Sequence, residues 1–264
     1  MFDDFMINTW ISASIIAAVA GVVGFFVVIR GSSFAAHALP LGAFPGGAAA
    51  SLLGINPLIG LLAFSGLGVI GISQLGRRGR HEVATALSLV MLLGLGALFL
   101  SMTTEYSQAV YALLFGQVLG VSNADLGPIA AVSAISIALM AMLYRPLLLS
   151  SLSPELAEAR GVSGRRMELL FLAIVALASA TALPVVGALL VFSLMVGPPS
   201  AARALTNRPL RAMLFSAGIS VVTVWASIAL SFVSDWPIGF FVGALGALAY
   251  GIGRAGALEA LVRR

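Results

Sequence analysis

The chain has 264 residues, of which 60% are hydrophobic and only 9% are charged, and its mean hydropathy is +1.09. So much apolar surface is incompatible with a water-soluble core and indicates a protein of the lipid bilayer. The net charge of +4 does not indicate a nucleic-acid partner, because the basic residues are scattered rather than gathered in a patch. The absence of cysteine excludes disulfides and thiolate metal sites, and without lysine a Walker-type ATP site cannot form.

The apolar runs predict about nine membrane-spanning helices, since in lipid the backbone polar groups must be satisfied within each helix. Their approximate limits are 7–29, 35–55, 57–76, 83–104, 126–148, 167–183, 186–202, 212–233 and 238–254. The sixth and seventh are short and meet near Pro184, so one broken helix with a re-entrant part, giving eight spans, is the alternative. The polar interruptions are too short for a domain with its own core. The expected fold is therefore an all-α polytopic helix bundle that forms a single domain over residues 1–264.

The distribution of charge predicts the orientation of these spans. With nine crossings and the N-terminus outside, all fourteen arginines fall on the cytoplasmic side, where basic residues collect in membrane proteins. The opposite side receives only acidic residues. We therefore expect the N-terminus outside and the C-terminus in the cytoplasm of a multi-pass protein of the plasma membrane.

The loop between the fifth and sixth spans, LSSLSPELAEARGVSGRRMELLF, predicts a short helix on the cytoplasmic side. Ser153, Pro154 and Glu155 are typical of a helix start, and Gly161 of a helix end. Such a capped helix, at about residues 153–162, is suited to docking on a cytosolic partner. It is also compatible with a plain connector.

Two further stretches predict irregular backbone. Pro198 and Pro199, near the end of the seventh span, are expected to break the helix and free carbonyl groups. Membranes tolerate such a break where protein or a water-filled cavity covers it. The segment 110–126, with glycines at 116 and 120, could form part of a gate.

Together these stretches resemble the permease subunit of bacterial ABC importers for zinc, manganese and iron. The similarity rests on an arginine after the first span, the FPG triplet, LLFGQVLGVSNADL, ELAEARGV and VVGALLVFSLMVGPPSAARAL. It implies a fold like that of type II importers and a subunit that homodimerises around a translocation path. It also implies docking on cytosolic ATPase subunits, which bind the ATP, and delivery of substrate by an extracytoplasmic binding protein. The chain itself would bind no cofactor and would carry no enzymatic site.

Carried over from the family, the coupling helix that docks on the ATPase runs from Pro154 to Val162. Glu158, Ala159 and Gly161 match the glutamate, the alanine and the following glycine of the family pattern. Closure of the ATPases would pull this helix, and rigid spans would transmit the movement to the gates.

His37 lies where the resemblance predicts a metal ligand. The family has an Asp there and a His four residues later on the same helix face, whereas this chain has His37 and Leu41. A lone imidazole binds zinc, iron or manganese only weakly, and leucine cannot assist. His37 is thus a substrate contact in a remodelled path, a hydrogen-bonded structural histidine, or part of a metal site completed by the partner subunit.

Because this chain lacks the Asp and His pair of the family, more than one class of substrate stays open. Free divalent metal is the expected substrate, with a chelated metal or haem as the alternative. An ion-driven secondary transporter is disfavoured because every Asp and Glu falls near a span end or in a loop. An intramembrane serine protease is disfavoured because no nucleophile motif accompanies His37.

Overall fold

The computed structural model describes residues 4–76, 81–102, 116 and 121–262, and all regular structure in these ranges is helical. The long helices are α1 (Asp4–Ile29), α2 (Ser33–Leu53), α3 (Pro57–Leu75), α4 (His81–Ser101), α6 (Asn123–Leu152), α8 (Gly164–Val186), α9 (Ala188–Leu205), α10 (Pro209–Ser234) and α11 (Ile238–Val262). A six-residue helix, α7 (Pro154–Ala159), joins α6 to α8. Most of the predicted segment 110–126 lies outside the described residues.

Local chemistry explains where several helices begin. The side chain of Asn56 accepts a hydrogen bond of 2.8 Å from the amide of Leu58, and Pro57 occupies the first turn of α3. At the start of α6, the carboxylate of Asp125 accepts bonds from the amide and the hydroxyl of Ser122, at 3.1 and 2.6 Å. These caps place the helix starts within a few residues of the predicted spans.

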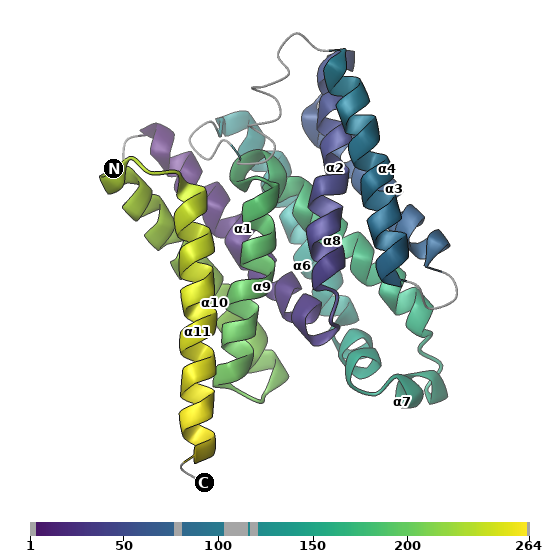
Figure 1. Cartoon of the computed structure of the whole chain (residues 1–264), viewed down its shortest axis with the longest axis vertical. Coiled ribbons are helices and arrows are strands. Elements are labelled where there is room, and N and C mark those ends of the chain that lie inside the picture. The colour runs from purple at the N-terminus through teal and green to yellow at the C-terminus, as the bar shows by residue number, and fades with distance from the viewer. Residues whose placement is uncertain (1–3, 77–80, 103–115, 117–120, 263–264) are drawn as a thin grey trace.

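The helices pack into two groups that share α8 and α9 as their common centre (Figure 1). In one group α2 packs against α3 and α4, and in the other α1 and α11 pack against α9 and α10. The contact between α2 and α3 is close because Gly46 and Gly60 face each other, and a side chain on either would collide with the backbone of the other. Small residues allow such contacts between membrane helices.

Seven helices in the described part of the chain are long and apolar enough to cross a membrane. They are α1, α3, α4, α6, α8, α10 and α11. Helix α9 is short in its apolar part, Leu190–Leu205, and α2 is less apolar because it carries His37, two prolines and several glycines. Bulky apolar side chains on the outer faces are exposed, among them Met91, Met142, Val222 and Val233. This surface fits hydrocarbon rather than water.

The sixth and seventh predicted spans are two helices that reverse direction. Helix α8 ends at Val186, and α9 starts after one residue, Gly187, whose φ of 83° favours glycine. Helix α8 starts beside α7, and α9 runs back toward that same end of the bundle (Figure 1).

The expectation that Pro198 and Pro199 break the helix is wrong. Both lie inside α9, which continues to Leu205. A proline leaves the carbonyl four residues earlier without its helical partner. The carbonyl of Met195, four residues before Pro199, lies against Gly24 of α1, so close packing by α1 covers the backbone at this point.

The arginines of the described helices gather at one end of the bundle. This is the end where α7 projects (Figure 1). It holds the α1–α2 turn with Arg30, α7 with Arg160 directly after it, the α9–α10 turn with Arg208 and the C-terminal part of α11 with Arg254. We call this the α7 end. The start of α1, the α2–α3 turn and the α10–α11 turn with Asp235 lie at the opposite end.

Candidate functional site

The loop around α7 is a compact, capped element that presents charged residues to solvent. Ser153 stands at the N-cap but makes no side-chain capping bond; its carbonyl accepts from the amide of Ala157 at 3.0 Å. The buried side chain of Ala157 anchors the helix, and Glu158 and Ala159 are exposed. This short helix thus has one buried residue that holds it to the bundle and several residues that are exposed.

Gly161 closes this helix in a Schellman motif. The amide of Gly161 donates to the carbonyl of Glu158, and the amide of Val162 donates to the carbonyl of Ala157, both at 2.9 Å. Gly161 has a φ of 76°, a left-handed conformation that residues with a side chain rarely adopt. The match of Gly161 to the family pattern therefore has a local structural reason.

His37 lies on the first turns of α2, where α2 approaches α9. Its ring meets the ring of Phe192 edge to face, with centroids 4.8 Å apart. The Nδ1 atom is buried and has no hydrogen-bond partner among the described residues. Buried polar atoms are normally paired, so an unpaired one calls for an explanation, such as an ordered water, an ion or a functional role. The three predicted roles of His37 stay predictions.

Leu41 lies four residues after His37 and belongs to an apolar contact. It packs against a cluster formed by Ala43, Leu61, Ala180, Leu183 and Ala188. This cluster joins α2 to α3 and to the reversal between α8 and α9. The position at which the family carries a histidine is therefore a packing position here.

No group of three or more His, Asp or Glu side chains that could hold a metal ion occurs within the described residues. His37 is accordingly a single potential ligand in the described part of one copy of the chain. Any transported ion held there would need further ligands from water or from a second copy.

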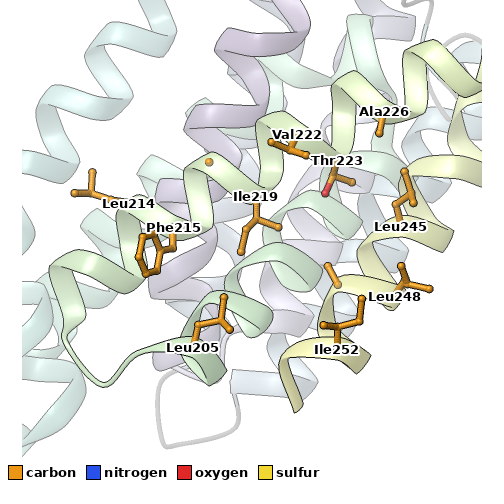
Figure 2. Close-up of a pocket in the computed structure, with 12 residues that line it drawn as sticks. Leu205, Leu214, Phe215, Ile219, Val222, Thr223, Ala226, Leu245, Leu248 and Ile252 are labelled. Carbon is orange, nitrogen blue, oxygen red and sulfur yellow. The ribbon is translucent and has the colours of Figure 1, made fainter. Parts of the chain in front are cut away.

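Two cavities lie away from His37. A groove of about 520 Å³ between α10 and α11 is apolar except for Thr223, and side chains from the two helices face each other across it (Figure 2). Such a lining suits lipid chains and offers no ligand to an ion. At the end opposite α7, a pocket of about 200 Å³ is bordered by Asn56, Asp125, Thr181 and Pro184, close to the α8–α9 reversal. Gly116 packs against the backbone of this reversal.

Arg30 is not among the site residues predicted from the sequence, where it contributes only to the orientation and to the family resemblance. Arg30 turns inward at the α7 end, and its Nη1 atom donates to the hydroxyls of Ser150 and Ser151 at 3.0 and 3.1 Å. Its guanidinium group lies over the ring of Phe171, 5.3 Å from the centroid. An arginine at the end of a span carries no sequence signal that separates an inward from an outward side chain.

The bundle of apolar helices, with a short helix projecting at one end, is similar to solved structures of transporters. In structure, the chain is similar to the PsaBC complex from Streptococcus pneumoniae, with a TM-score of 0.86 and 24% identity, covering 96% of this chain and 91% of the other. It is also similar to a putative metal-chelate type ABC transporter in an inward-facing conformation, with a TM-score of 0.71 and 18% identity, covering 93% and 85%. These likenesses show the fold.

The sequence comparisons show the family. The profile of the ABC 3 transport family matches residues 2–253. The manganese import system permease protein ScaB of Streptococcus pneumoniae is 31% identical over 225 residues, 83% of this chain and 78% of that protein. The manganese transport system membrane protein MntC of Listeria innocua is 28% identical over 237 residues, 89% and 84%. The chain belongs to the ABC 3 transport family. It is a multi-pass membrane permease of the metal ABC importer family.

Proposed function

We propose that this chain moves a divalent metal, manganese in the first place, into the cell. Relatives at 28–31% identity are named as manganese permeases. The energy comes from ATP hydrolysed by separate cytosolic subunits, and an extracytoplasmic binding protein delivers the ion. Two copies of the chain enclose the path. In each copy nine helices, α2 and α9 included, cross the membrane, with the N-terminus outside.

The observation that carries the proposal is the position of α7. It projects from the arginine-rich end of the bundle and exposes Glu158 and Ala159 beyond the membrane helices (Figure 1). Basic residues collect on the cytoplasmic side of membrane proteins. In this proposal the α7 end therefore faces the cytoplasm, where an ATPase can bind α7. Gly161 fixes the shape of this helix.

His37 contributes one ligand within the path. Its buried, unpaired Nδ1 atom supports this role, as does its place where α2 meets α9. Polar side chains inside a membrane domain are by default functional.

A chelated metal or haem is the second candidate substrate, and the apolar packing of Leu41 favours it. A complexed metal needs fewer ligands from the pore than a bare ion, because the chelator already fills the coordination sites. Uptake of manganese, zinc, iron and haem by vesicles that contain the full transporter distinguishes the two. Uptake of manganese but not haem supports the first candidate, and uptake of haem alone overturns it.

The docking proposal is tested by a pair of matched charge removals. Glu158→Gln removes a carboxylate at α7, and Asp235→Asn removes one at the opposite end of the bundle. We expect Glu158→Gln to lower ion uptake per ATP hydrolysed while the protein stays folded, and Asp235→Asn to have no effect. Equal coupling in both variants would contradict docking through α7.

Orientation is tested by single cysteines, which the chain lacks. A cysteine at position 235 should react with an impermeant maleimide on intact cells. A cysteine at position 158 should react only after permeabilisation. The reverse pattern would place α7 outside and remove the proposed mechanism.

A further inference from the structure

Arg30 joins three helices at the α7 end of the bundle. It follows the last residue of α1, and its side chain contacts Ser150 and Ser151 near the end of α6 and Phe171 near the start of α8. The two serine hydroxyls are themselves fixed, because each also donates to the carbonyl of Leu147, at 3.0 and 2.5 Å. The guanidinium group therefore binds to a surface that is already ordered.

The helices that Arg30 touches are those that carry α7. Ser151 lies three residues before Pro154, where α7 begins, and Phe171 lies on the second turn of α8, after α7. A displacement of α7 must pass through the end of α6 and the start of α8. Arg30 is in contact with both.

Arg30 is also connected to the start of α2 through a stiff turn. The amide of Ser32 donates to the carbonyl of Val27 at 2.9 Å, and Gly31 has a φ of 66°, so α1 ends in a closed Schellman motif. Helix α2 begins at Ser33, four residues before His37. The path from the contacts of Arg30 to His37 is thus a rigid turn and one turn of helix.

Charge explains why arginine is suited to this position. Burial lowers the pKa of Arg30 from its ordinary value, and the nearby charge of Glu168 opposes this effect. The guanidinium nevertheless stays protonated, as arginine does in proteins. Its planar group can stack on an aromatic ring and donate hydrogen bonds at the same time, which lysine cannot. Arg145, Arg160 and Arg165, near the same end, are exposed, so orientation in the membrane does not require the inward placement of Arg30.

We propose that Arg30 is a positioning residue that transmits the movement of α7 to α2 and so to the ion path at His37. Energetic coupling between distant sites is carried by packed, hydrogen-bonded networks of this kind. The inference depends on the proposed docking role of α7. It assigns a function to a contact that fold and family membership alone do not specify.

The test uses the complete transporter, with its ATPase, in vesicles, and measures ATP hydrolysis and manganese uptake together. Arg30→Gln should still assemble with the ATPase and hydrolyse ATP, but transport about tenfold fewer ions per ATP, within the range for mutations in coupling networks. Arg30→Lys should be intermediate, because it keeps the charge and loses the planar stack. The control Arg145→Gln, on the exposed side of α6, should match the wild type.

A second readout does not depend on the transported ion. Phe34 lies on the first turn of α2 and its side chain is 42% exposed. Trapping with ATP and vanadate should change the maleimide reaction rate of a Phe34→Cys variant. Adding Arg30→Gln should abolish this change while vanadate is still trapped. If the role of Arg30 were purely structural, Arg30→Gln would instead reduce the amount of folded complex. The complex that still folds would keep the change in maleimide reaction rate.

Two further variants separate the possible outcomes. Should Arg30→Gln fail to fold, the double variant Ser150→Ala and Ser151→Ala keeps the cation and removes only the hydrogen bonds, and it should also lower the uptake per ATP. If this double variant, or a folded Arg30→Gln variant, takes up as much manganese per ATP hydrolysed as the wild type, the inference is overturned. Loss of coupling in Glu158→Gln but not in the Arg30 variants rejects only the transmission role, whereas normal coupling in Glu158→Gln rejects the docking role of α7.

Discussion

The imidazole of His37 on α2 and the ring of Phe192 on α9 meet edge to face, with 4.8 Å between their centroids. The two residues lie 155 positions apart in the chain. This contact places an ionisable side chain where the two groups of helices meet, and it leaves Nδ1 buried without a partner among the described residues.

Replacement of His37 by alanine tests the role of this nitrogen. We expect about a tenfold rise in the manganese concentration for half-maximal uptake, equivalent to roughly 1.4 kcal/mol of lost binding. His37→Gln, which keeps polar atoms at this position, should lose less. Phe34→Ala, on the preceding turn, serves as the control. Unchanged uptake of manganese, zinc, iron and haem in His37→Ala would show that the histidine is structural.

Replacement of Leu41 by histidine should create an i, i+4 pair of imidazoles on one face of α2. Two imidazoles bind zinc more tightly than one, so zinc binding measured by calorimetry on the purified protein should increase. The loss of Leu41 from its apolar cluster should at the same time lower the melting temperature. Leu41→Gln, which also disrupts the cluster, provides the control, and equal zinc binding by both variants would contradict the pairing.

The close approach of α2 and α3 at Gly46 and Gly60 predicts a strong effect of added volume. Gly46→Val should force the helices apart and cost about 1–3 kcal/mol, as overpacking does. Gly66→Ala on α3, where nothing lies within 4 Å of an added Cβ, should be nearly neutral. Melting of the two detergent-solubilised variants measures the difference. Equal melting temperatures would be inconsistent with the observed contact.

The left-handed conformation of Gly161 predicts a local cost for a side chain there. Gly161→Ala should destabilise the end of α7 by about 1–2 kcal/mol, since alanine disfavours this conformation. Gly164→Ala, at the start of α8, has open space around it and serves as the matched control. The global melting temperature should change little, because Gly161 is exposed, while uptake per ATP should fall. A fully coupled Gly161→Ala variant would argue against the docking role of α7.

Sequence alone determined the features that depend on local physical chemistry. Long apolar runs predicted the long helices to within a few residues, except for the C-terminal end of α11, because lipid leaves backbone groups no partner outside their own helix. Seven of the described helices are long and apolar enough to cross a membrane, and the prediction of nine spans stays a prediction. Proline and glycine at the two ends of α7 predicted that helix, since their effects are set by adjacent residues. The family resemblance rested on such local patterns, and the family is confirmed.

Only the tertiary structure decided which distant side chains meet. Nothing local distinguishes Arg30, which turns inward onto Ser150 and Phe171, from an exposed arginine such as Arg145. The prediction that Pro198 and Pro199 break the helix was wrong. Whether a freed carbonyl is covered depends on a neighbouring helix, which is here α1 at Gly24. In a bundle whose helices are apolar on nearly all sides, hydrophobic patterning does not say which face meets which. Side-chain volume and close backbone contacts decide that, and both are properties of the assembled fold.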